Sequence, residues 1–278
     1  MIICSLGYGY LASFLFKQLS SYGVMCYGVS DKIENVTDMI NFKIFLRKDS
    51  KYVLNCTTHL LITAPPDKYG CPIFNSYSDV ITDTNIRSIL YTSTTGVYGN
   101  HNGEWVNEES TLKATNSIDK NRIKAEEQWK NFSIKNNIKY NILRLSSIYG
   151  PNRLNNFKND KNIIAVKKNF FFSRIHVYDA ARIITNIIFG GFNNEIWNLT
   201  DNKPSTREDY LMEIIRLRNI RKYEIINYNE YKKKLSKTAK KFWENNKKVS
   251  NNKITAKLKY RFLFPDFKSG LKNLKKYL

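Results

Sequence analysis

A short stretch near the start of the chain, Gly7 to Ala12, has the residue types and spacing that can hold a phosphate group. It reads Gly-Tyr-Gly-Tyr-Leu-Ala, a pattern in which the first glycine makes a tight turn and the second lets the backbone approach a pyrophosphate. A side chain at Gly9 would hold that group away from the N–H groups at the start of a helix. Six residues alone also fit an ordinary tight turn, so the surrounding elements decide between the two interpretations.

The turn needs a strand in front of it and a helix behind it. Ile2 to Leu6 is an apolar run typical of a buried parallel strand, and Leu11, Phe14 and Leu15 follow at helical spacing. Strand, glycine turn and helix therefore occur in the order that a dinucleotide site requires.

Asp31 follows a second apolar strand, Val24 to Val29, at the place where an acidic side chain meets the ribose of a dinucleotide. A carboxylate there accepts a hydrogen bond from a ribose hydroxyl and repels a 2′-phosphate, which favours NAD(H). Ser30 and Lys32 would accommodate the phosphate of NADP(H) if Asp31 turned away. In the simplest alternative, Asp31 only caps the next element.

Strands and helices continue to alternate, which predicts an α/β fold of the Rossmann type with a doubly wound parallel sheet. The segment from Asp31 to Ser50 is expected to form a short helix and a loop. The expected strands and helices after it are Tyr52 to Asn55 (strand), His59 to Ala64 (strand), Ile73 to Ile86 (helix), Ser88 to Thr94 (strand), Ser117 to Ile134 (helix) and Lys139 to Leu145 (strand).

The pattern changes after Pro151, so we expect a Rossmann core over residues 1–151 and a smaller substrate-side α/β cap over residues 152–278, with some segments returning to the core. Ser205 and Glu208 have the spacing of a capping box that opens a helix. The other elements expected in this half are strands over Phe170 to His176 and Glu195 to Thr200, a helix over Asp179 to Ile188, and a surface helix and loop from Tyr231 to Lys248.

Prolines stop the fourth expected strand at the carboxyl edge of the sheet, where open α/β sheets bind ligands. We expect a dinucleotide to contact the glycine turn and the ends of the neighbouring strands. The expected cofactor contacts are Gly7, Tyr8, Gly9, Tyr10, Leu11, Ser30, Asp31, Lys32, Ala64, Pro65, Pro66 and Thr92.

Composition narrows the class of protein. The chain of 278 residues has an apolar fraction of 42%, but no apolar run approaches the roughly 20 residues of a membrane span. Its four cysteines show neither zinc spacing nor a disulfide framework, so we expect a cytoplasmic protein without a metal site. The net charge of +21 could indicate nucleic-acid binding, but its lysines are interspersed with many Asn, Ile and Tyr residues, which favours a solvated surface.

Four stretches occur in the order and spacing of one family. They are Gly7 to Ala12, Thr92 to Gly99, Arg144 to Pro151 and Arg174 to Asp179. Together they resemble the extended short-chain dehydrogenase/reductases, and most closely the atypical nucleoside-diphosphate-sugar epimerase-like branch. The resemblance implies an NAD(P) cofactor, a nucleotide-sugar or related small substrate, and a homodimer.

The resemblance also implies catalytic positions. It places Thr94 where the family has the Ser or Thr that hydrogen-bonds the substrate oxygen. The family's Tyr-x-x-x-Lys pair falls on Ile118 and Arg122, in the register set by Glu126. Arginine can hold the nicotinamide ribose and supply positive charge, but it does not relay protons near neutral pH, and isoleucine has no proton to give.

Three side chains near the expected carboxyl edge, Tyr98, Tyr149 and His101, could replace the missing tyrosine, although packing roles are the stronger interpretation for each. His176 could contact substrate or pack at a strand end. Arg153 and Arg174 have guanidinium forks that suit a diphosphate, but ordinary surface or interface pairing is an equal alternative.

Three functions remain open from the sequence. The first is an NAD(P)-dependent oxidoreductase or epimerase-like enzyme that acts through Thr94 and Arg122. The second is a dinucleotide-binding sensor or scaffold without turnover, which the missing tyrosine motivates. The third, nucleic-acid binding through the Lys232 to Lys248 segment, rests on charge alone.

Overall fold

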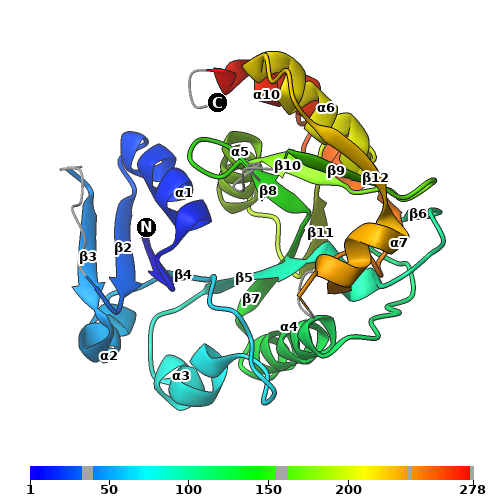
Figure 1. The fold of residues 1–278 in the computed structure, drawn as a ribbon. Coiled ribbons are helices and arrows are strands. Elements are labelled where there is room, and N and C mark those ends of the chain that lie inside the picture. The colour runs from blue at the N-terminus through cyan, green and yellow to red at the C-terminus, as the bar shows by residue number, and fades with distance from the viewer. Residues whose placement is uncertain (33–39, 155–161, 237–239, 276–278) are drawn as a thin grey trace. The chain divides into compact units, whose positions relative to one another are not determined.

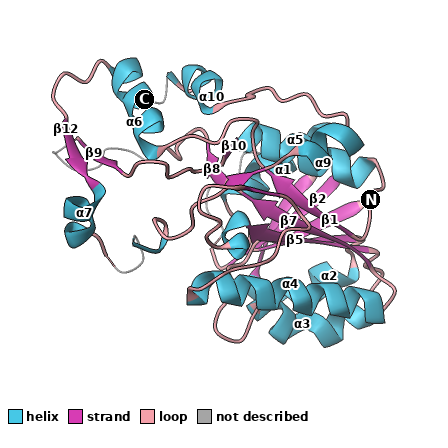
Figure 2. Cartoon of the chain, turned by 90° about the vertical axis from the view of Figure 1, so that its right-hand side faces the viewer, coloured by secondary structure: helices cyan, strands magenta, loops and turns pink. Residues whose placement is uncertain are grey.

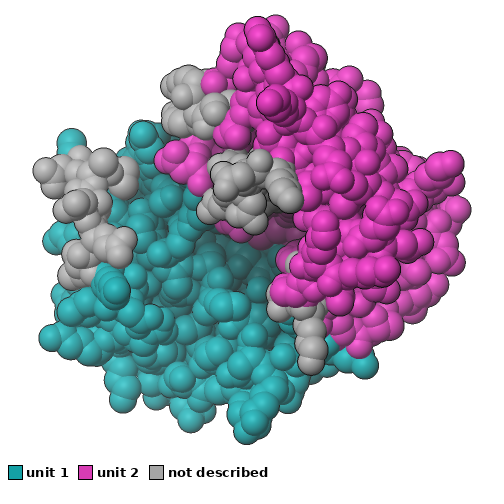
Figure 3. All heavy atoms as spheres, in the orientation of Figure 1, with its two compact units in different colours: residues 1–94, 117–144, 181–197 teal, residues 95–116, 145–180, 198–278 magenta. Residues whose placement is uncertain are grey.

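The computed structural model describes residues 1–32, 40–154, 162–236 and 240–275. The chain forms two compact units, which Figure 3 colours separately. Unit 1 contains residues 1–94, 117–144 and 181–197, and unit 2 contains residues 95–116, 145–180 and 198–278. Thus residues 181–197 of the expected cap half belong to unit 1, whereas residues 95–116 and 145–151 of the expected core half belong to unit 2.

Unit 1 is built on a seven-stranded sheet with the order β11-β7-β5-β4-β1-β2-β3 (Figure 1). Chain order runs outward in both directions from β1 and β4, which is the doubly wound arrangement. The pairs β1–β2, β2–β3, β1–β4 and β4–β5 are parallel, so the predicted Rossmann-type sheet is confirmed. Its strands are β1 (Ile2–Leu6), β2 (Met25–Ser30), β3 (Phe42–Leu46), β4 (His59–Ile62), β5 (Ser88–Thr94), β7 (Lys139–Leu145) and β11 (Glu195–Leu199).

Helices cover both faces of this sheet. Figure 2 shows α2, α3 and α4 in one layer and α1 and α5 on the opposite face. The ends of α1 and α5 meet through the rings of Tyr22 and Phe189, whose centroids are 5.7 Å apart. The helices are α1 (Tyr10–Ser21), α2 (Ser50–Asn55), α3 (Pro72–Thr82), α4 (Ser117–Lys135) and α5 (Val177–Phe189).

One apolar core of unit 1 lies between the sheet and the layer of α2, α3 and α4. Apolar side chains of the strands, such as Ile62 and Tyr91, pack there against Val53, Ile73 and Trp129 of the helices. All five side chains are at most 2% exposed. The apolar runs that predicted the strands are therefore buried as parallel strands should be.

The prediction for the third strand is wrong. Tyr52 to Asn55 lies in α2, and the third strand is β3, in the segment where we expected a helix and a loop. Phe42 pairs with Cys26 and Leu46 with Ser30 of β2. A short apolar pair such as Val53-Leu54 fits a helix as well as a strand, and only the packing against the sheet decides between them.

Unit 2 contains short helices and parallel strand pairs. The pairs are β10–β8, β12–β9 and β13–β6. Their strands are β6 (Trp105–Val106), β8 (Ser147–Tyr149), β9 (Ile163–Val166), β10 (Arg174–His176), β12 (Glu224–Asn227) and β13 (Lys248–Val249). The helical elements are η2 (Thr95–Tyr98), α6 (Arg207–Arg218), α7 (Tyr228–Tyr231), η3 (Lys232–Lys234), α9 (Asn252–Lys257) and α10 (Phe267–Asn273).

The predicted capping box of α6 is one residue out of place. The cap is Thr206, whose hydroxyl accepts from the Asp209 N–H while the Asp209 side chain accepts from the Thr206 N–H. Ser205 is used elsewhere: its backbone bridges to Phe172, and its hydroxyl accepts from Arg174 at 2.6 Å.

The lysine-rich segment from Tyr231 to Lys248 is not uniformly exposed. Trp243 is 5% exposed and Lys247 6%, and the ammonium of Lys248 lies 5.0 Å from the centre of the Phe171 ring. Residues 237–239 of the segment lie outside the described residues. In the described part of the chain, no helix is both long enough and apolar enough to cross a membrane.

Candidate functional site

Gly7 is required by the fold itself. Its φ of +97° is one that L side chains rarely adopt, and a Cβ there would lie 2.9 Å from Thr63 Oγ1 and 3.1 Å from Ala64 N. The N–H groups of Gly7 and Tyr8 donate to Val29 O at 3.3 and 3.0 Å. This glycine therefore lets the chain leave β1 between the ends of β2 and β4.

Gly9 has a different reason to be glycine. It is the N-cap of α1 with an extended backbone, and a Cβ built on it would meet no atom of the described residues within 4 Å. The described residues therefore leave room for a side chain at this position. The open space lies at the N-terminus of α1, where the first N–H groups of a helix have no acceptor inside it, and it fits a phosphate group close to the backbone.

The aromatic residues of the turn pack beside it. A Cβ on Gly28 would lie 2.9 Å from the Tyr8 ring, so Tyr8 lies against β2, and its ring centroid is 5.2 Å from that of Phe42. Tyr10 contacts Phe14 with centroids 5.0 Å apart, and Leu11 is buried. These side chains support the turn.

Asp31, at the carboxyl end of β2, forms an ion pair that the sequence did not predict. Arg47 donates to its two carboxylate oxygens at 2.5 and 2.9 Å. These hydrogen bonds lower the pKa of Asp31. Arg47 follows β3, and because we misplaced that strand we did not see that Arg47 lies beside Asp31. Ser30 and Lys32 flank the pair, and the Ser30 hydroxyl accepts from the Lys32 N–H at 3.4 Å.

Ala64, Pro65 and Pro66 follow β4. They lie next to the glycine turn, because a Cβ added at Gly7 would be 3.1 Å from the backbone nitrogen of Ala64. Thr92, on the adjacent strand, has a structural contact: its hydroxyl donates to Ile62 O at 2.9 Å across the sheet. The Thr92 side chain thus joins β5 to β4, while its carbonyl oxygen accepts from Arg122 at 2.9 Å.

Arg122 lies on α4 against β5. Besides Thr92 O, its Nη1 atom donates to the Tyr91 hydroxyl at 3.3 Å. Its Nε atom is buried and has no hydrogen-bond partner among the described residues. Burial raises the pKa of Tyr91 far above its usual value, so this tyrosine stays protonated. Thr94, half-buried, ends the same strand two residues beyond Thr92.

A buried network sets the orientation of α4. Glu126, one helical turn after Arg122, accepts from the Ser93 hydroxyl and pairs with the Arg144 guanidinium at 2.8 Å. Both charged side chains are at most 7% exposed. Since residues four apart share a helix face, this network turns Arg122 toward β5. Ile118, one turn before Arg122, is 47% exposed at the start of α4.

The side chains considered as substitutes for the missing tyrosine belong to unit 2, where they have structural contacts. The Tyr98 hydroxyl donates to Asn198 Oδ1 at 2.7 Å, and His101 Nε2 lies 3.2 Å from Thr111 O. Tyr149 is 3% exposed, and burial raises its pKa. Burial lowers the pKa of His176 to about 4, so that ring is neutral near neutral pH.

Arg174 also has structural contacts within unit 2. Besides the Ser205 hydroxyl, its guanidinium donates to Phe172 O at 3.2 Å and lies 4.4 Å from the centre of the Tyr210 ring. The side chain is buried, and none of the described contacts directs it to solvent.

Comparison with known proteins agrees with this architecture. Residues 76–171 match the model of the NAD dependent epimerase/dehydratase family. A conserved protein of unknown function from Silicibacter pomeroyi shares 29% sequence identity, with a TM-score of 0.90, over 99% of this chain and 98% of its own. Residues 76–171 of this chain are therefore similar to that family, and the whole chain shares the fold of the Silicibacter pomeroyi protein.

More distant structures share the fold of this chain. A UDP-glucose 4-epimerase from Thermotoga maritima, solved with UDP-glucose, is 14% identical, with a TM-score of 0.75, over 99% of this chain and 97% of its own. A human epimerase family protein solved with NADPH is 13% identical, with a TM-score of 0.74, over 100% and 99%. No curated protein matches the sequence.

Unit 1 thus brings most of the predicted site residues to one edge of its sheet. The glycine turn, Asp31, Ala64 to Pro66 and Thr94 all follow or end parallel strands, and these carboxyl ends lie at a common edge. The sequence missed Arg47 and the buried partners of Glu126. Among the described residues, no group of three or more His, Cys, Asp or Glu side chains could hold a metal ion.

Proposed function

We propose that this chain binds NAD(H) or NADP(H) and acts as an oxidoreductase or epimerase-like enzyme on a carbonyl or hydroxyl group of a nucleotide sugar or related small metabolite. The observation that carries the proposal is the open space at Gly9. Packing within the described structure does not require a glycine there, whereas a dinucleotide pyrophosphate does.

The cofactor would supply a hydride acceptor or donor, and residues of unit 1 would position the reacting groups. The Thr94 hydroxyl would donate a hydrogen bond to the substrate oxygen and polarise its bond to carbon. Arg122 would hold the nicotinamide ribose through its guanidinium, whose Nε atom is buried without a partner among the described residues. Isoleucine at position 118 supplies no proton, so the proposal assigns no proton transfer to α4.

The choice between the two cofactors would depend on the Asp31–Arg47 pair. Asp31 accepts hydrogen bonds from a ribose, as NAD(H) requires. Arg47 already lies against it, and a guanidinium in that place suits a 2′-phosphate. The pair would therefore admit either cofactor, with the orientation of Arg47 setting the preference.

The substrate class rests on the structural neighbours. The Thermotoga maritima enzyme is named for a UDP-sugar and was solved with one, and a Bacillus cereus UDP-glucuronic acid 4-epimerase was solved with a UDP-sugar analogue and NAD. At 14% and 13% identity these proteins support the fold and make a nucleotide sugar the first substrate to test.

One observation favours a second candidate function, a dinucleotide-binding sensor or scaffold without turnover. The position that would carry the catalytic tyrosine is Ile118, an exposed apolar side chain. A sensor needs the glycine turn but does not need an acid at this position.

Calorimetric titration of the purified chain with NADH and with NADPH tests the shared part of both candidates. We expect binding of at least one cofactor in the micromolar range, and absence of both would refute both. A substrate screen with UDP-sugars then separates them. Turnover that falls in Thr94→Ala and in Arg122→Met, but not in the matched surface variant Thr82→Ala, supports the enzyme. Turnover that appears only after the double change Ile118→Tyr and Arg122→Lys supports the sensor.

A further inference from the structure

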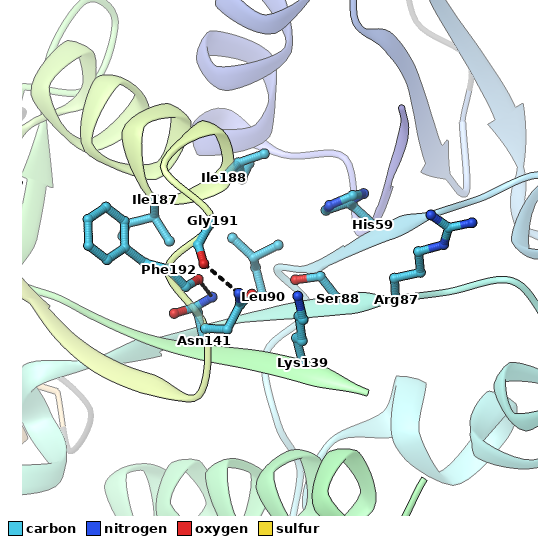
Figure 4. Close-up of a pocket in the computed structure, with 11 residues that line it drawn as sticks. His59, Arg87, Ser88, Leu90, Lys139, Asn141, Ile187, Ile188, Gly191 and Phe192 are labelled. Carbon is cyan, nitrogen blue, oxygen red and sulfur yellow. Dashed lines mark hydrogen bonds between the residues drawn. The ribbon is translucent and has the colours of Figure 1, made fainter. Parts of the chain in front are cut away.

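The opposite edge of the same sheet has a pocket of about 160 Å³. It lies at the amino ends of β4, β5 and β7, beside the turn that follows α5 (Figure 4). A single buried water needs roughly 10–15 Å³, so the pocket has room for a small molecule. All of its lining residues belong to unit 1.

Three basic residues meet there because of the strand order. His59 begins β4, Arg87 directly precedes β5, and Lys139 begins β7. These strands are neighbours in the sheet, and His59 is in register with Ser88. Residues that stand far apart in the chain therefore converge on one edge, as the starts of parallel strands must.

The pocket contains no compensating negative charge. None of its lining residues, all of which the structure describes, is acidic. The pKa of His59 is lowered by burial and by the positive charges of the Met1 amino group, Arg87 and Lys139. A bound anion would offset the repulsion between these positive charges and would favour the protonated form of His59.

Carbonyl oxygens at the end of α5 already accept hydrogen bonds from the protein. Asn186 O, Ile187 O and Ile188 O, at the end of the helix, accept from backbone N–H groups of the following turn. Beyond them, Phe192 O accepts from Asn141 Nδ2 at 2.8 Å. The negative end of the helix is therefore capped by the protein, and the long basic side chains remain as the charged groups of the pocket.

His59 can offer a donor to an anion. Its Nδ1 atom lies 2.9 Å from the Thr58 hydroxyl, and that hydroxyl donates its own proton to Ile2 O at 2.9 Å. With that proton on Ile2 O, Nδ1 donates to Thr58, and Nε2 is the atom that takes up a proton. A protonated ring would then donate from Nε2.

The other wall of the pocket is apolar. Leu90, Ile187 and Phe192 line it, and Figure 4 shows Ile187 and Phe192 on the side away from the three basic residues. We propose that this pocket binds a small organic anion, with its carboxylate or phosphate group held by His59, Arg87 and Lys139 and its apolar body against Leu90, Ile187 and Phe192.

Three small aromatic probes test the proposal by NMR of the histidine ring protons in the full chain. Benzoate and phenyl phosphate carry the two anionic groups on the same ring, and benzamide is a neutral analogue of benzoate. We expect the anions, but not benzamide, to shift the His59 signals and raise the pKa of His59, because an anion favours the protonated ring. The anion that binds more tightly shows whether the pocket prefers a carboxylate or a phosphate group.

Charge-removing variants complete the test. Lys139→Gln and Arg87→Gln alter exposed side chains, so both should fold, and each should weaken anion binding by about tenfold through loss of a charge-assisted hydrogen bond. Lys43→Gln removes an exposed lysine from β3, the outermost strand on the far side of β4 from the pocket. This control variant should bind the anions as the natural chain does. Equal responses to benzoate and benzamide, unmoved His59 signals, or equal losses in Lys43→Gln and Lys139→Gln would overturn the proposal.

Discussion

The two edges of the sheet in unit 1 are built from different parts of the chain. At the carboxyl edge the open space at Gly9 lies at the N-terminus of α1, whose first N–H groups come from one contiguous segment of the chain. At the amino edge the basic groups are side chains of His59, Arg87 and Lys139, which lie at the starts of three separate strands. A backbone site has a sequence pattern because its geometry needs glycines, whereas a side-chain site depends on which strands become neighbours.

The edges also differ in how their charges are balanced. Glu126 and Arg144, which orient α4 at the carboxyl side, form a buried pair. We expect Glu126→Gln to lower the free energy of unfolding by about 3–5 kcal/mol, because Arg144 would keep a buried charge without its partner. Urea unfolding measures the loss. The neighbouring exposed Glu127→Gln and the amino-edge Lys139→Gln should each change stability by less than about 0.5 kcal/mol, and a cost shared by all three would contradict this difference.

Matched alanine substitutions separate the two glycines of the turn. Gly7→Ala should destabilise the fold by about 1–3 kcal/mol, because its positive φ strains any side chain and its Cβ would meet Thr63. Gly9→Ala should cost less than about 1 kcal/mol and weaken binding of NADH and NADPH about tenfold or more, since its Cβ fills the space for the pyrophosphate. Thermal unfolding and calorimetry measure the two effects. If Gly9→Ala bound both cofactors as well as the natural chain does, the carboxyl edge would be architecture only.

The Asp31–Arg47 pair should control which cofactor the carboxyl edge prefers. Asp31→Asn removes the carboxylate that repels a 2′-phosphate and releases Arg47, so the ratio of NADPH to NADH affinity should rise about tenfold. Arg47→Gln should move the ratio in the opposite direction. Parallel titrations of the two variants with both cofactors measure the ratios, and shifts of the same sign in both would show that the pair does not choose the cofactor.

The sequence predicted most of the strands that form the carboxyl edge, but not all of the residues that meet there. The strands that became β1, β4, β5 and β7 have strong apolar runs, and buried parallel strands need such runs. β3 was missed because its short segment has no stronger pattern than that of α2, and Arg47 was missed with it. The partners of Glu126 could not be predicted, since Ser93 and Arg144 meet it only when α4 packs across β5 and β7.

The pocket at the amino edge could not be predicted either, because its residues also meet only in the folded chain. His59, Arg87 and Lys139 have no spacing that indicates a site, because 27 to 79 residues of chain separate them in sequence. Only the order β7-β5-β4 brings them together. A contiguous motif can be recognised from one chain, whereas a pocket of this kind requires the strand order.

The smallest expected effect concerns the pH dependence of stability at the amino edge. The pKa of His59 is lowered from its usual 6.5 in the folded chain, so the unfolded chain binds more protons as the pH falls through 6.5, and His59 then destabilises the fold. His59→Asn should reduce the loss of stability on acidification from pH 7 to pH 5, measured by urea unfolding at each pH. Bound benzoate should also reduce the loss of stability of the natural chain on acidification, because it raises the pKa of His59. A variant that loses stability as steeply as the natural chain would show that the basic side chains at this edge do not repel one another, and the two edges would then differ in geometry but not in charge.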